Sequence, residues 1–235
     1  MILECLGSES AGNSYILKAD SGEVLLLEAG INFKEVKKAL GYNLSGVVGC
    51  FVTHAHFDHS KYIRDFAKAG IDCYCNQDTI EKLSLQSNHR VQNMPEKKLF
   101  HIGRFTIIPF SVVHNVPCNG FLIHHPESGK ILFATDAAFI PHRFTGLSHI
   151  LIEANYSDEA MVSDRAVGHH MALDTALTFI RQNVSPTLRN VVLLHLSATN
   201  SDEKQFIKEV KSVAPCADVV AADKGVVVNL SINPF

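Results

Sequence analysis

The chain has 235 residues, of which 46% are hydrophobic, and its formal net charge at pH 7 is −3. This length and hydrophobic content suffice for one substantial core, so we expect a single domain over residues 1–235. The weak charge argues against a strongly basic protein that coats nucleic acid, and the absence of any run of about 18 apolar residues argues against a membrane span. The first residues lack the pattern of a signal peptide, so we expect a cytoplasmic protein whose six cysteines are free thiols.

The first half of the chain consists mainly of predicted strands. Apolar runs separated by turn-forming residues predict strands over residues 2–6, 14–18, 23–28 and 47–52, and a helix over residues 33–40. A glycine-containing loop over residues 7–13 joins the first two strands.

The most informative stretch is Thr-His-Ala-His-Phe-Asp-His-Ser over residues 53–60, between the strand at 47–52 and a predicted helix. His54 and His56 lie two apart in an extended segment, so their side chains can point the same way. Asp58 and His59 open the helix and can face a second point. Once a distant ligand joins, three imidazoles and a carboxylate exceed the needs of one tetrahedral ion, so the stretch predicts two metal ions suited to hydrolysis.

Strands and helices alternate in the rest of the chain. We expect strands over residues 71–75, 105–113, 120–124, 130–135, 149–153, 191–194, 219–221 and 226–230, helices over 78–85, 172–181 and 203–213, and a long loop over 84–98. This mixture predicts an α/β (α+β) fold in which two sheets carry helices on the outside.

His-x-His-x-Asp-His after an apolar strand is the signature of the metallo-β-lactamase fold superfamily, and the chain resembles that family over nearly its whole length. The resemblance implies a four-layer αββα sandwich. It also implies further ligands where three predicted strands end, at His114, Asp136 and His195. Asp136 could in addition cap the segment that follows it.

The ligand sets that the resemblance implies are His54, His56 and His114 for one ion and Asp58, His59 and His195 for the other, with Asp136 bridging both. Imidazole-rich ligation with carboxylates suits zinc, and manganese stays open. Two such ions lower the pKa of a water between them, which provides a hydroxide nucleophile.

Several segments resemble the bacterial exonuclease-like branch of the family and ribonuclease Z. They are the loop Gly-Ser-Glu-Ser-Ala-Gly-Asn-Ser at 7–14, Asp-Arg-Ala-Val-Gly-His-His at 164–170, His-Leu-Ser-Ala-Thr-Asn at 195–200 and Glu-Ala-Asn at 153–155. The resemblance implies that Glu153 holds a protonated His169, which donates a proton to the leaving oxygen. His170 stays the alternative, because the residues after His169 depart from both branches. The long substrate-clamping arm of ribonuclease Z has no counterpart here, so transfer RNA processing is not expected.

The leading functional hypothesis is a dinuclear phosphodiesterase, above all a nuclease for DNA or RNA, with Asp58, Glu153 and His169 as catalytic residues. The expected phosphate contacts are Lys61, Arg64, Arg143 and Arg165. The alternatives are a phosphodiesterase for small substrates such as cyclic nucleotides, a hydrolase for thioesters, lactones or β-lactams, and a metal-bound scaffold without activity. Oligomeric state is left open, with a homodimer among the options.

Overall fold

In the computed structural model, residues 1–157 and 168–232 are described, and they form two seven-stranded sheets. The first sheet has the order β14-β1-β2-β3-β4-β5-β6, with β1 (Ile2–Glu9), β2 (Gly12–Lys18), β3 (Val24–Leu27), β4 (Val47–Phe51), β5 (Cys73–Cys75), β6 (Val91–Asn93) and β14 (Val227–Asn229). The second has the order β13-β12-β11-β10-β9-β8-β7, with β7 (Phe100–Ile102), β8 (Phe105–Val112), β9 (Cys118–His125), β10 (Gly129–Ala134), β11 (His149–Glu153), β12 (Asn190–Leu194) and β13 (Asp218–Ala221).

The two sheets pack face to face through one apolar core. Large rings from the two sheets interlock there: Tyr15 lies edge-on to Phe133 with 5.4 Å between ring centroids, and Phe51 lies edge-on to Phe121 at 5.8 Å. Such edge-to-face pairs add to the burial of apolar area that drives the packing. The inner faces of both sheets are thereby removed from water.

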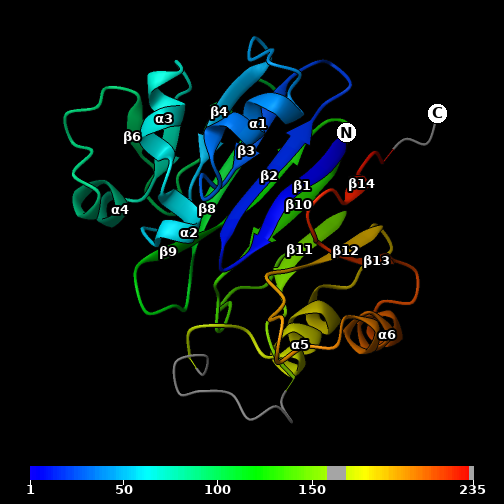
Figure 1. The fold of residues 1–235 in the computed structure, drawn as a ribbon. Coiled ribbons are helices and arrows are strands. Elements are labelled where there is room, and N and C mark those ends of the chain that lie inside the picture. Colours follow the sequence, from blue (N-terminus) through cyan, green and yellow to red (C-terminus); the bar gives the residue numbers. More distant parts are fainter. Residues whose placement is uncertain (158–167, 233–235) are drawn as a thin grey trace.

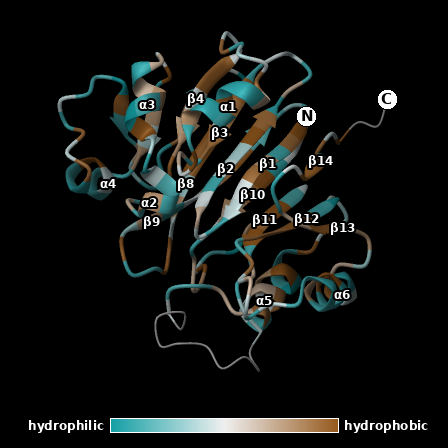
Figure 2. Ribbon diagram, in the orientation of Figure 1, coloured by the Kyte–Doolittle hydropathy of each residue, from teal (hydrophilic) through white to brown (hydrophobic). Residues whose placement is uncertain are grey.

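Helices cover the two outer faces (Figure 1). The helices α1 (Phe33–Ala39), α3 (Ile63–Lys68) and α4 (Gln77–Lys82) bury apolar side chains against the first sheet, while α5 (Leu173–Asn183) and α6 (Glu203–Val213) do so against the second. The hydropathy of the ribbon agrees, since α6 presents hydrophilic residues to the outside while the strands are mostly hydrophobic (Figure 2). The expected four-layer αββα sandwich is therefore confirmed.

The differences from the expected elements are confined to short segments. The loop expected over 84–98 contains β6, and β7 was not expected; both have three residues and form an end of a sheet. A three-residue strand is too short to show alternation, and the partner of β6 is β5, which is distant in sequence. The motif helix is divided into α2 (Phe57–Ser60) and α3.

Parallel pairing sets the position of the functional residues. In the first sheet β3, β4, β5 and β6 run parallel, and in the second β10, β11, β12 and β13 do. The carboxyl ends of parallel strands meet at one edge, which is where ligands bind in open α/β sheets. Within residues 1–157 and 168–232, none of the helices has the length and apolar character that a membrane span requires.

Candidate metal centre

Strand ends bring the expected ligands together. β4 leads into His54 and His56, β8 into His114, β10 into Asp136 and β12 into His195. Asp136 and His195 both have a positive φ, of 49° and 52°, so the backbone turns sharply as it leaves each strand. Their side chains are buried at the edge of the sandwich rather than continuing along the sheet.

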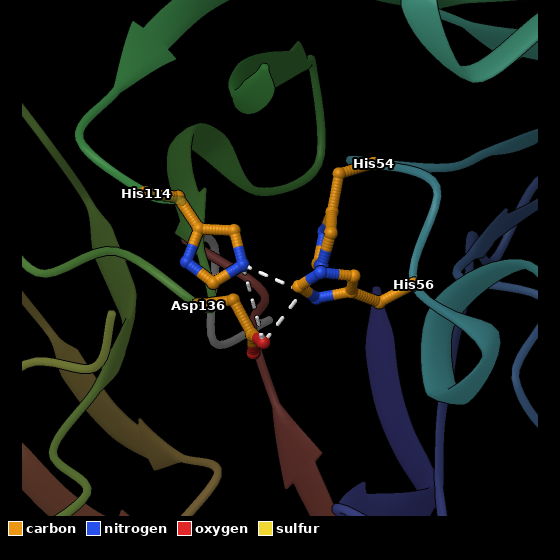
Figure 3. A group of neighbouring side chains, drawn as sticks. All are labelled: His54, His56, His114 and Asp136. Atoms are coloured by element: carbon orange, nitrogen blue, oxygen red, sulfur yellow. Dashed lines mark hydrogen bonds and ion pairs between the residues drawn. The ribbon is translucent and has the colours of Figure 1, made fainter. Parts of the chain in front are cut away.

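One group consists of His54, His56, His114 and Asp136, whose ligand atoms all lie within 4.8 Å of one another. His114 Nε2 is 3.3 Å from His56 Nδ1. Asp136 Oδ2 lies 3.8 Å from His54 Nε2 and 3.9 Å from His114 Nε2. The four side chains point toward a common centre (Figure 3).

The other carboxylate oxygen of Asp136 faces a second group. His59 Nε2 is 3.2 Å from Asp136 Oδ1 and 3.2 Å from Asp58 Oδ2, and His195 Nδ1 is 3.1 Å from the same Asp136 Oδ1. Asp136 thus directs one oxygen to each group, as expected of a bridging carboxylate. All seven ligands that the sequence suggested lie around Asp136, and their roles as ligands stay predictions. Beside the first group, the ligand atoms that lie within 4.8 Å of one another are those of Asp58, His59 and Asp136 in one set, and those of Asp136, Glu153, His170 and His195 in another.

The unpaired ring nitrogens of the centre fit a divalent cation. Among the described residues, the buried Nε2 atoms of His54 and His195 have no hydrogen-bond partner. A buried polar atom without a partner costs free energy, and coordination to a cation would satisfy an imidazole nitrogen. Imidazoles and carboxylates are ligands of zinc and also of manganese.

A further layer of contacts orients the imidazoles. His54 Nδ1 lies 2.9 Å from Thr53 Oγ1, and His114 Nδ1 donates to the backbone carbonyl of His169 at 2.8 Å. The Nε2 atom of His114 then carries no proton, and its lone pair faces Asp136. This arrangement is usual for metal-binding histidines. His59 Nδ1 lies 3.3 Å from Oε1 of the buried Glu28.

The close approach of these buried side chains shifts the pKa values of Asp136 and His59. Burial alone would raise the pKa of Asp136, but His59 and His195 hold it well below its usual value. Burial would lower the pKa of His59, yet Asp136 and Glu28 raise it well above its usual value. Protons on His59 therefore compensate the buried carboxylates, and a cation that binds there must displace them.

Glu153 is fully buried and its carboxylate is shared by two imidazoles. Its Oε1 lies 2.7 Å from His170 Nδ1 and 3.1 Å from His195 Nδ1, while Oε2 accepts from the backbone N–H groups of Ala137 and Met171. Burial lowers the pKa of His170, but the hydrogen bond and charge of Glu153 outweigh it, so the pKa is raised. Glu153 thus favours the protonated form of His170 at the edge of the metal centre.

The prediction that His169 contacts Glu153 is wrong, because His170 lies beside the Glu153 carboxylate instead. Backbone bonds from Asn155 N–H to the Met171 carbonyl and from Leu173 N–H to the Tyr156 carbonyl fix the register of the two segments. The residue next to Met171 is then the one beside the carboxylate. His169 contributes its carbonyl to His114, and the two rings lie 6.2 Å apart. Which imidazole donates a proton stays a prediction.

The expected phosphate contacts have different environments. Arg64 donates to the backbone carbonyls of Leu83 and Ser84, so its guanidinium is already bound by the protein. Lys61 and Arg143 are exposed. Arg165 lies outside the described residues.

Two residues of the centre were not singled out from the sequence. Asn13 is buried and its Nδ2 lies 3.1 Å from His59 Nε2 and 3.4 Å from Asp58 Oδ2. Glu28 lies beneath His59. The available signals were the position of Asn13 in the loop that resembles one branch of the family, and an acidic residue at the end of the apolar run that forms β3.

Comparisons with known proteins agree with this geometry. A family model described as "Beta-lactamase superfamily domain" matches residues 24–196. No curated protein matches the chain.

Solved structures share the whole fold at low sequence identity. The metallo-β-lactamase fold protein YhfI from Bacillus subtilis is 18% identical with a TM-score of 0.77, and the alignment covers 97% of this chain and 98% of that one. A diphosphatase from the PhnP family is 16% identical with a TM-score of 0.73, covering 97% and 96%. The short form of human tRNase Z is 17% identical with a TM-score of 0.67, covering 98% and 99%.

Proposed function

The chain belongs to the beta-lactamase superfamily, and on this basis we propose that it is a dinuclear metal-dependent phosphodiesterase that hydrolyses nucleic acid. The observation that carries the proposal is the Glu153–His170 pair at 2.7 Å. Glu153 holds a proton donor beside the ligands, and a phosphodiester needs one because an alkoxide is a poor leaving group. Opening a β-lactam does not need a donor in that place.

The residues of the site have different roles in the proposed reaction. Two divalent cations would supply Lewis acidity for the phosphate and lower the pKa of a water at the site. Asp136 holds the two ligand groups at one separation, since each of its oxygens serves one group. Glu153 engages Nδ1 of His170, so Nε2 is the ring atom left to donate a proton. The His170 side chain is 25% exposed, which lets it meet a substrate from solvent.

The names of two of the similar structures are compatible with a phosphate substrate. One of them is named a diphosphatase and another a tRNase. A thioester expels a thiolate, which departs without protonation, so a thioester hydrolase of the same fold would not need the Glu153–His170 pair.

The test is a side-by-side assay of the metal-loaded protein with labelled DNA, labelled RNA, cyclic nucleotides and bis-p-nitrophenyl phosphate, with a thioester and a lactone beside them. We expect hydrolysis of DNA or RNA, with loss of activity in Asp136→Ala. Turnover of the thioester or lactone without cleavage of any phosphodiester would overturn the proposal.

A smaller phosphodiester is the second candidate, and Arg64 favours it. Arg64 is the expected phosphate contact on α3, yet it is bound to the carbonyls of Leu83 and Ser84. The remaining described contacts, Lys61 and Arg143, are fewer than a long phosphate backbone commonly uses. Turnover of a cyclic nucleotide with no cleavage of oligomers would select this candidate.

A further inference from the structure

A cavity of about 200 Å³ lies between the segment after Asp136 and the outer face of α5. Its apolar wall includes Phe139, Ile140 and Met171, and its polar wall includes Asp174, Thr178 and Gln182. The three polar residues are spaced by four along α5, so they lie on one face of the helix. The cavity therefore has an apolar side and a hydrogen-bonding side.

The apolar wall is next to the candidate metal centre. Phe139 pairs with Val113 through the Val113 N–H bond to the Phe139 carbonyl, which is 2.9 Å, and Val113 precedes His114. Met171 follows His170, and its N–H donates to Glu153. The apolar wall thus adjoins the segments that carry His114 and His170.

Phe139 is unusual for an aromatic residue because its side chain is 52% exposed, and the adjacent Val113 is 46% exposed. An exposed aromatic face beside a polar wall suits a planar ring that stacks on one side and forms hydrogen bonds at its edge. The volume is below the roughly 300–1,000 Å³ of sites for drug-sized ligands, so it fits one ring system rather than a whole nucleotide.

The chemistry of the polar wall restricts the occupant further. The hydroxyl of Thr178 and the amide of Gln182 offer hydrogen bonds to the edge of a ring, and the residues that line the cavity include no cationic side chain that a second phosphate would need. We propose that this cavity is the subsite for a nucleobase of the substrate, with Phe139 as the residue on which the base stacks. The proposal rests on the proposed function, since it places the base of the same phosphodiester.

The experiment compares the binding of adenosine 5′-monophosphate and ribose 5-phosphate to the metal-loaded protein by calorimetry. The two probes share the sugar phosphate and differ only in the base. We expect the nucleotide to bind roughly tenfold to a hundredfold more tightly, the usual scale for stacking of one base. Phe139→Ala should remove this difference, and Phe139→Trp should retain it.

A matched control is Tyr42→Asn, which removes an aromatic side chain that is 73% exposed and follows α1 in the outer layer of the other sheet. Tyr42 has a positive φ of 61°, which asparagine tolerates. Equal affinity of the wild type for the two probes, or a difference that survives in Phe139→Ala, would overturn the subsite. The protein could bind the nucleotide more tightly through Phe139 and yet cleave no phosphodiester. That result would support the subsite and would refute only the proposed function.

Discussion

His170 Nδ1 lies 2.7 Å from Oε1 of Glu153, the shortest histidine–carboxylate contact in the described part of the chain. The carboxylate is fully buried and also accepts the backbone N–H groups of Ala137 and Met171. Because these bonds fix its position, Glu153 can orient His170 and keep it charged. In the described part of the chain, His169 makes no hydrogen bond to Glu153, and its carbonyl accepts from His114 instead.

Replacing His170 by alanine should lower kcat on DNA or RNA by roughly 10²–10⁴-fold, the usual scale for one proton-transfer group. The loss should be much smaller with bis-p-nitrophenyl phosphate, since p-nitrophenolate departs without protonation. His169→Ala is the matched control, because alanine keeps the carbonyl that binds His114. Steady-state kinetics of both variants on both substrates decide the point, and equal losses of His170→Ala on the two substrates would contradict the assignment.

Asp136→Ala should reduce the metal content from about two equivalents per chain to one or fewer, because its two oxygens serve both ligand groups. The measurement is elemental analysis of protein purified without chelator. Asp65→Asn, an exposed carboxylate on α3, should leave the content unchanged. A wild type that saturates at one equivalent would contradict the dinuclear centre.

The fold could be predicted from the sequence where apolar runs were long. The runs that form β8 and β11 and the helical spacing that forms α5 indicate their elements without tertiary information. β6 and β7 could not be found in this way, because three residues carry no period and their pairing comes from β5 and β8.

The residues of the metal centre, like the elements of the fold, could be predicted only in part from the sequence. Ligands within the motif at 53–60 are set by local geometry, and those at strand ends were found through the resemblance. The places of Glu28 and His170 in the centre depend on tertiary packing. Glu28 belongs to the centre because His59 packs against it. His170 lies beside Glu153 because of the register of the two segments that are joined at Asn155 and Met171.

Glu28→Gln should weaken the binding of one ion by roughly 10–100-fold, the usual effect of losing a carboxylate partner of a ligating histidine. Glu28 Oε1 lies 3.3 Å from His59 Nδ1, whereas it reaches the other group only indirectly, since its Oε2 accepts from the Thr53 N–H and the Thr53 hydroxyl contacts His54 Nδ1. Chelator competition should therefore show one site that is weakened more than the other. Equal weakening of both sites would indicate a general loss of structure, which circular dichroism can detect.

Binding to DNA should weaken as salt rises, with each neutralised phosphate adding roughly 0.9 to the slope of log K against log salt. Lys61→Ala and Arg143→Ala should each reduce that slope by about 1, since both side chains are exposed. Arg64→Ala should leave the slope unchanged, because Arg64 is engaged by backbone carbonyls. Fluorescence anisotropy across a salt series measures these slopes, and a salt-independent affinity would instead favour the small substrate.

Stability should fall as the solution is acidified because of His149, which is buried away from the metal centre. Burial lowers its pKa to about 4, although hydrogen bonds, including the one from Nδ1 to Asn190 Oδ1 at 2.8 Å, oppose the shift. The unfolded chain takes up this proton near pH 6.5, while the folded chain resists it until about pH 4. The contribution is thus complete above pH 6.5 and is lost as the pH falls toward 4, by about 3 kcal/mol in all.

His149→Gln should flatten the pH dependence of the free energy of unfolding between pH 6.5 and 4, even though the variant is less stable at neutral pH. Urea denaturation at several pH values, with metal present at saturating concentration, gives the two curves. His89→Gln changes an exposed histidine, and its free energy of unfolding should depend on pH as that of the wild type does. Parallel curves for the wild type and His149→Gln would show that His149 titrates alike in the folded and unfolded chains, and that its burial does not resist protonation.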